Sequence, residues 1–212
     1  MHCYPDIKLS IFTKTPQLGL VKTRMQPDLS TSFSVELHTA LLNQQLSYFY
    51  KNNICPSTLW LSGDRNIFYK SLPQWQSLPI RRQQGNDLGA RMAYAVEREL
   101  QHHRGVILVG TDCPFINEET LDQVCQSLGN YDAVIIPALD GGYVLLAVKE
   151  YFAVLFQNIS WGESCVFEQT LSILCQLSLT VMTLQPLPDI DRPEDLVYLA
   201  KIPSLQRFTV SL

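Results

Sequence analysis

Closely spaced cysteine pairs are missing from this sequence. The six cysteines never form a CxxC motif; they stand at positions 3, 55, 113, 125, 165 and 175. Structural zinc sites and thiol redox motifs usually depend on such spacing. The sequence therefore predicts free thiols in place of a zinc site or a disulfide framework.

Long apolar runs and a surplus of positive charge are missing as well. No segment approaches the ~18 consecutive apolar residues of a membrane span. Asp6 and Lys8 stand where a secretory signal would be apolar. The chain carries 16 Lys and Arg against 20 Asp and Glu, a formal net charge of -4, whereas nucleic-acid binding needs clustered positive charge. We therefore expect a cytoplasmic protein with no membrane span and no nucleic-acid partner.

The signatures of several common enzyme classes are absent too. The sequence has no GK[ST] phosphate loop, no GxGxxG turn, no GxSxG elbow and no HxxxH or HxH pair. P-loop ATPases, Rossmann dehydrogenases and serine hydrolases therefore lose support. We expect His2 to lie in a frayed terminus, and the histidines on predicted helices, His38, His102 and His103, to be surface residues.

What is present is the composition of a globular protein. The 212 residues are 46% apolar and 17% charged, and a chain of this length can bury most of the surface that it exposes when unfolded. We predict a single domain over residues 1–212.

Hydrophobic patterning predicts strands and helices in alternation. Continuous apolar runs are typical of strands covered on both faces, and spacings of three and four are typical of amphipathic helices. The predicted strands are 7–14, 57–63, 80–83, 106–110, 133–139, 143–148 and 179–184. The predicted helices are 33–50, 88–100, one that begins at 117, 154–156, 166–177 and a terminal one that Pro193 starts within 189–200. This order predicts an α/β fold with a mostly parallel central sheet and helices on both faces.

Charged residues follow three of the predicted strands. Ligands of open parallel sheets bind at the carboxyl ends of the strands, a location that Lys14, Asp112 and Asp140 would share. Asp112 directly follows an apolar run, and a carboxylate there could hold Mg²⁺ or Mn²⁺ while the ion bridges two phosphates. The alternative is that Asp112 only caps the next helix.

The loop after the first strand gathers positive charge in an acidic chain. Lys14, Lys22 and Arg24 stand within eleven positions, around Gly19. Lys and Arg form charge-assisted hydrogen bonds with phosphate oxygens, and a glycine lets backbone amides approach closely. We predict an anionic ligand here, and the alternative is a solvated charged loop.

Other polar candidates have ordinary structural alternatives. Asp140 precedes two glycines and could simply form a hairpin turn. Asp189 and Asp191 precede a helix that proline starts, where carboxylates also serve as caps. Asp87 could cap the predicted helix 88–100, which also carries Arg91; both are candidates for nucleotide binding.

Six motifs follow one another along the chain: FTKTPQLGLVKTRM, QGNDLGARM, VGTDCP, PALDGGYVLL, an isolated tryptophan at Trp161 and DIDRPEDL. In this order they resemble bacterial proteins of the DUF2064 group, the rSAM-selenodomain-associated transferases. The likeness runs from about Ile7 to Ala200. The group is classed with nucleotide-diphospho-sugar transferases of the GT-A fold, so the resemblance implies a GT-A-like (Rossmann-like) three-layer sandwich.

The resemblance also implies roles for single residues. It makes the first loop the phosphate-binding element, Asp112 the metal-binding acidic residue and Asp191 a second metal ligand. The residues that would form the wall facing the acceptor or sugar are Asp140, Gly141, Gly142, Tyr143 and Trp161. Two motifs depart from the group: TDCP stands in place of a DxD motif, and WGES in place of a WST-like segment.

Three functions remain open at this point. The first is a metal-dependent, glycosyltransferase-like enzyme with a nucleotide-diphospho-sugar donor and a small-molecule acceptor, in which Asp140 takes the acceptor's proton. The second is a nucleotidyltransferase that attacks the α-phosphorus of an NTP and releases pyrophosphate. The third is a nucleotide-binding module without turnover.

Overall fold

The computed structural model describes residues 3–26 and 28–209, so the prediction for His2 falls outside the described part. The strands are β1 (Ile7–Lys14), β2 (Ser57–Ser62), β3 (Ile80–Arg82), β4 (Gly105–Gly110), β5 (Ala133–Pro137), β6 (Tyr143–Val148) and β7 (Val181–Thr183). The α-helices are α1 (Thr31–Asn52), α2 (Arg65–Ser71), α3 (Leu88–Glu99), α4 (Glu118–Asn130) and α5 (Val166–Gln176). Short 3₁₀ helices are η1 (Thr23–Met25), η2 (Pro73–Trp75), η3 (Ala153–Phe156), η4 (Pro193–Lys201) and η5 (Pro203–Phe208).

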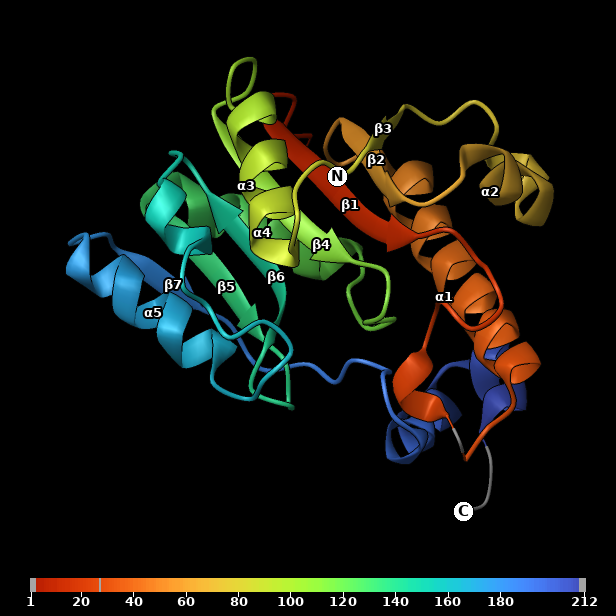
Figure 1. Ribbon diagram of the computed structural model, residues 1–212. Coiled ribbons are helices and arrows are strands. Elements are labelled where there is room, and N and C mark those ends of the chain that lie inside the picture. Colours follow the sequence, from red (N-terminus) through yellow and green to blue (C-terminus); the bar gives the residue numbers. More distant parts are fainter. Residues whose placement is uncertain (1–2, 27, 210–212) are drawn as a thin grey trace.

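The seven strands form one sheet in the order β3-β2-β1-β4-β6-β5-β7 (Figure 1). Every neighbouring pair is parallel except the two that β6 makes with β4 and β5. The predicted mostly parallel α/β sheet is therefore confirmed. β6 runs the other way because a tight turn joins it to β5: the N–H of Ala138 donates to the carbonyl oxygen of Gly142 at 3.0 Å, and a hairpin needs no crossover.

Helices cover both faces of the sheet, which gives three layers. On one face, α1 and α4 pack on alternate residues of β1 and β4, among them Ile11 and Ile107. On the other face, α3, η3 and α5 pack on residues such as Leu108 and Leu146. The predicted three-layer sandwich is therefore confirmed. It forms because the continuous apolar strands at the centre of the sheet have to bury both of their faces.

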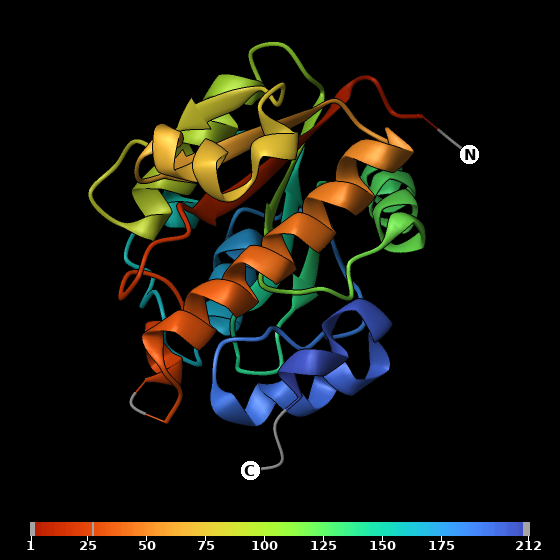
Figure 2. The same cartoon turned by 90° about the vertical axis from the view of Figure 1, so that its right-hand side faces the viewer.

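The C-terminal 3₁₀ helices cover the remaining side of α1 (Figure 2). Leu37 and Leu41 of α1 pack there against residues of η4 and η5, including Leu199 and Phe208. The predicted terminal helix forms as the 3₁₀ helix η4, which begins at Pro193, the proline that the sequence places at its start. The chain before it is held in an extended course by sheet-like contacts, such as the 3.0 Å bond from the N–H of Leu187 to the carbonyl oxygen of Pro137.

Capping residues set the starts of three helices. Asp87 accepts from the N–H of Ala90 at 2.8 Å and caps α3, as the sequence predicts. Asn117 caps α4 in the same way. α2 was not predicted; Asp64 caps it, and Phe68 is the only buried residue among its seven, so no apolar periodicity marks it. No helix in the described part of the chain has both the length and the apolar character to cross a membrane.

Candidate functional site

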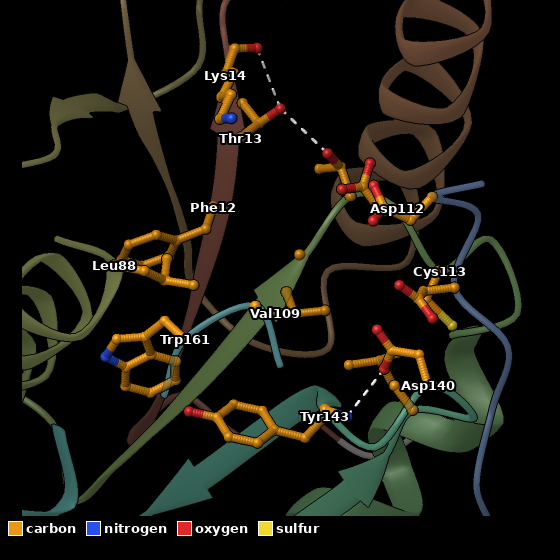
Figure 3. Close-up of a pocket in the computed structure, with 18 of the residues that line it drawn as sticks. Phe12, Thr13, Lys14, Leu88, Val109, Asp112, Cys113, Asp140, Tyr143 and Trp161 are labelled. Carbon is orange, nitrogen blue, oxygen red and sulfur yellow. Dashed lines mark hydrogen bonds between the residues drawn. The ribbon is translucent and has the colours of Figure 1, made fainter. Parts of the chain in front are cut away.

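A cavity of about 570 Å³ opens where the carboxyl ends of β1 and β4 meet the β5–β6 turn. Its walls also include the first loop, the start of α3 and the segments 161–163 and 189–191. Figure 3 shows the carboxylates of Asp112 and Asp140 on one side of it, and Leu88, Trp161 and Tyr143 on the other. We call the side with Asp112 and Asp140 the charged side, and the side with Leu88, Trp161 and Tyr143 the aromatic side. The cavity lies at the strand ends where the sequence predicts a ligand.

Lys22 joins three segments on the charged side. Its ammonium group lies 2.6 Å from Asp112 Oδ1 and also donates to the carbonyl oxygen of Ile190. The N–H of Ile190 in turn donates to the carbonyl oxygen of Asp112 at 2.9 Å. These contacts close a ring between the first loop, the end of β4 and the chain before η4.

The two members of this ion pair differ in exposure. The Lys22 side chain is 2% exposed and that of Asp112 is 47% exposed. Asp112 Oδ1 is sealed from solvent, so the exposed part of the carboxyl group faces the cavity. Burial acts to raise the pKa of Asp112, but the charge of Lys22, helped by His38, outweighs burial and the pKa is lowered. Asp112 is therefore a carboxylate with one oxygen side bound internally and the rest available to a ligand.

Arg24 makes a second, more open ion pair. Its Nη1 lies 2.9 Å from Asp191 Oδ2, and its Nη2 donates to the carbonyl oxygen of Gly162 at 2.7 Å. The side chains of Arg24 and Asp191 are 40% and 28% exposed. Lys22 and Arg24 are thus paired with Asp112 and Asp191, the two residues predicted as metal ligands.

Asp189 is a further carboxylate of the charged side, for which the sequence indicates only a capping role. It lines the cavity, and its pKa is raised to about 6, first by burial and then by the neighbouring charges of Asp140, Asp191 and Asp112. The capping role belongs to Asp195, whose Oδ2 accepts from the N–H groups of Asp191 and Arg192 at 2.9 and 2.7 Å. The charged side therefore concentrates negative charge that its lysine and arginine only partly offset.

Asp140 and its two glycines build the turn between β5 and β6. Asp140 Oδ1 accepts from the N–H of Gly142 at 2.9 Å, so the turn fixes the carboxylate, which also lines the cavity. Gly141 has a φ of 91°, and a Cβ there would lie 2.0 Å from the carbonyl oxygen of Ser164. Gly141 is thus a packing residue outside the cavity lining, while Gly142 lies in it.

The aromatic side depends on close packing. The rings of Tyr143 and Trp161 meet edge to face with centroids 6.4 Å apart. A Cβ on Gly89 would lie 2.5 Å from Trp161 Nε1 and 2.4 Å from the carbonyl oxygen of Phe156. Only a glycine at this position of α3 lets the indole lie against the helix.

Similarity to known proteins identifies the family of the chain. The family model "Uncharacterized protein conserved in bacteria (DUF2064)" matches residues 46–163, more than half of the chain. The chain belongs to the DUF2064 family. No curated protein matches it significantly.

Three solved structures illustrate what this DUF2064 protein is similar to. A protein from Desulfovibrio desulfuricans G20, provisionally named a nucleotide-diphospho-sugar transferase, is 27% identical, with a TM-score of 0.86 over 96% of this chain and 91% of that one. The 4-diphosphocytidyl-2C-methyl-D-erythritol synthase of Anaerococcus prevotii DSM 20548 is 13% identical, with a TM-score of 0.60 over 92% and 96%. Rv0371c of Mycobacterium tuberculosis H37Rv in complex with manganese is 13% identical, with a TM-score of 0.56 over 98% and 100%. The last two show the fold alone, and the first indicates an enzyme of the transferase class.

The structure of the DUF2064 protein brings most of the predicted site residues to one cavity. Those that line it are Lys14, Lys22, Arg24, Arg91, Asp112, Asp140, Gly142, Tyr143, Trp161 and Asp191. Gly19, Asp87 and Gly141 do not line it. Gly19 has a φ of 74° with open space around it, and Asp87 is occupied as the α3 cap.

Two lining residues were misjudged or missed in the sequence. His38 was predicted at the surface, which is wrong: it is 4% exposed, lines the cavity and lies with Nε2 3.0 Å from the carbonyl oxygen of Lys14. Burial lowers the pKa of His38, although Asp112 opposes the shift. Gln83 was missed; its side-chain amide donates to the carbonyl oxygens of Thr13 and Trp60 at 3.0 and 2.9 Å and so ties β3 to β1 and β2 beside the cavity.

Proposed function

We propose that this DUF2064 protein is a metal-dependent transferase that takes a nucleotide-diphospho-sugar as donor and a small molecule as acceptor. The observation that carries the proposal is the meeting of the cationic first loop and the carboxylates in one cavity, with Lys22 2.6 Å from Asp112 and Arg24 2.9 Å from Asp191. The diphosphate of such a donor is the kind of anion that lysine, arginine and a metal ion bind together. The name of the Desulfovibrio relative supports the same donor class.

Asp112 and Asp191 fit a Mg²⁺ or Mn²⁺ ion. These ions prefer oxygen ligands and often use only one or two carboxylates, with phosphate oxygens and water as the remaining ligands. No group of three or more His, Cys, Asp or Glu side chains is preassembled for a metal within residues 3–26 and 28–209. Burial is the main cause that raises the pKa of Asp189, and the charges of the neighbouring carboxylates add to the rise; a cation would offset only those charges. A bound ion would supply charge stabilisation for the leaving diphosphate.

The other side chains divide the remaining tasks. Lys14 and Arg91 line the cavity and supply positive charge for phosphate oxygens. Asp140, held by the N–H of Gly142, is our candidate for the base that takes the proton of the acceptor. Trp161 and Tyr143 form an apolar wall of the kind that packs against a sugar ring or an acceptor.

Thermal unfolding with a ligand panel tests the proposal. UDP-, GDP- and TDP-sugars and free NTPs are each added with and without Mn²⁺, because a ligand of the folded state raises Tm by mass action. We expect a nucleotide sugar to raise Tm more with Mn²⁺ than without. Asp112→Asn should abolish the metal-dependent part, while Asp6→Asn, an exposed acid before β1 at the opposite sheet edge, should keep it. A panel in which no nucleotide changes Tm would refute the proposal.

The same proteins separate glycosyl from nucleotidyl transfer. Incubation with each donor is followed by ³¹P NMR, which distinguishes a nucleoside diphosphate from pyrophosphate. Release of the diphosphate from a nucleotide sugar supports our proposal. Pyrophosphate release from an NTP in its place would show the nucleotidyltransferase that the sequence left open.

A further inference from the structure

Two ion pairs set cations of the charged side against its carboxylates. Lys22 and Arg24, the cations suited to phosphate, are each paired with a carboxylate suited to a metal, Asp112 and Asp191. Neither set of groups is fully available while these pairs persist. A phosphate that takes the cations leaves the carboxylates unpaired, and a metal that takes the carboxylates leaves the cations unpaired.

We propose that ligand binding proceeds by exchange of ion-pair partners, so that the metal ion and the diphosphate each depend on the other for tight binding. This inference rests on the proposed function and describes how binding of the metal ion and binding of the diphosphate are coupled at the same site. In the exchanged state, the metal neutralises Asp112 and Asp191 while the phosphates neutralise Lys22 and Arg24. Each ligand alone has to break an ion pair and leave one partner uncompensated, which is costly in a partly buried site.

The two pairs contribute unequally to this dependence. Arg24 and Asp191 are partly exposed, and Arg24 has its bond to the Gly162 carbonyl oxygen as a second contact. Lys22 is 2% exposed and keeps its bond to the Ile190 carbonyl oxygen. Both cations therefore have a fixed second contact, which lets them turn from carboxylate to phosphate without leaving the cavity. The open Arg24 pair is the one that can exchange first.

Measuring Mn²⁺ binding in the absence of phosphate tests the exchange. Arg24→Gln frees Asp191, so its affinity for Mn²⁺ alone should rise by about threefold to tenfold over wild type. Arg192→Gln removes the same charge one position after Asp191, from an exposed side chain, and should change the affinity much less. The free Mn²⁺ concentration is read from its electron paramagnetic resonance signal. An unchanged or weaker Mn²⁺ affinity in Arg24→Gln would overturn the proposal.

Inorganic pyrophosphate supplies the second measurement. In wild type, Mn²⁺ should tighten pyrophosphate binding, and linkage requires the reciprocal effect to be equal. Part of this coupling comes from metal–phosphate contact, which Arg24→Gln retains. The rest comes from exchange. The factor by which Mn²⁺ tightens pyrophosphate binding should therefore be smaller in Arg24→Gln than in wild type. An equal factor would mean that metal–phosphate contact is the whole cause.

Lys22→Met gives an independent check with a different readout. The variant leaves Asp112 without its internal partner, so Mn²⁺ alone should raise its Tm more than it raises that of wild type. An equal or smaller rise would count against exchange. Exchange can fail in these tests while wild type still binds pyrophosphate with Mn²⁺, in which case the proposed function stands. Absence of pyrophosphate binding by wild type with Mn²⁺ would sink both.

Discussion

The two sides of the cavity are held by different physical means. The charged side is assembled by ion pairs and hydrogen bonds between separate segments, such as Lys22 with Asp112 and Arg24 with Asp191. The aromatic side is assembled by contact at van der Waals distance, with Trp161 lying where the Cβ of Gly89 would otherwise stand. Ion pairs can change partners, whereas packed rings can only be displaced. We infer that the charged side rearranges on binding and that the aromatic side is already formed.

The largest effect is expected at the turn where the two sides of the cavity meet. Gly141→Ala should destabilise the protein by about 3–5 kcal/mol, because the new Cβ meets the Ser164 carbonyl oxygen and the backbone is left-handed. The φ is 91° and the clashing distance is 2.0 Å. Urea unfolding measures the loss.

Gly19→Ala is the matched control for Gly141→Ala. Gly19 has a φ of 74°, but no atom lies within 4 Å of the place that a Cβ would occupy, so alanine there carries the conformational cost alone, about 1–2 kcal/mol. Equal losses in the two variants would show that the contact with Ser164 is not what requires glycine at the turn.

A smaller effect is expected within the aromatic side. Gly89→Ala should cost about 1–2 kcal/mol, since overpacking against Trp161 outweighs the helix-forming advantage of alanine. Trp161 fluorescence should shift because the indole has to move. Binding of a nucleotide sugar should weaken while Mn²⁺ binding stays at the wild-type level, since the charged side is untouched.

Gly129→Ala separates packing from helix propensity. Gly129 lies in α4 with nothing within 4 Å of its Cβ position, so alanine there should stabilise the protein by up to about 1 kcal/mol. If Gly89→Ala stabilises the protein as well, the aromatic side is looser than the structure indicates.

The same contrast explains what the sequence could predict. Continuous apolar strands are local signals, and β1 forms with the predicted bounds. The candidates of the charged side were found because strand ends share one edge of a parallel sheet. Their pairing was not predicted, because the Arg24–Asp191 bond joins residues 167 positions apart and no local pattern reports such a contact.

The errors have physical causes of the same kind. His38 was expected at the surface because a lone histidine on an amphipathic helix normally is. In the structure His38 lies against the end of β1, with Nε2 3.0 Å from the carbonyl oxygen of Lys14, and its neighbours Leu37 and Leu41 pack against η4 and η5, which are distant in sequence. Gly89 carried no signal either, since its role depends on Trp161, a residue of another segment.

His38 offers the smallest and most selective test of the charged side. Its folded-state pKa is lowered by burial, so the unfolded chain takes up a proton first as the pH falls below about 6.5. The stability contribution is therefore present above that pH and is lost as the pH falls through the folded pKa. The groups that act on its charge are Asp112, which opposes the shift, and Lys22 and Lys14, which add to it.

His38→Gln can still donate to the Lys14 carbonyl oxygen but does not titrate. Urea unfolding between pH 7 and pH 5 should show a steeper loss of unfolding free energy for wild type than for the variant. Parallel curves would mean that His38 is solvated and that the charged side is more open to water than its geometry implies.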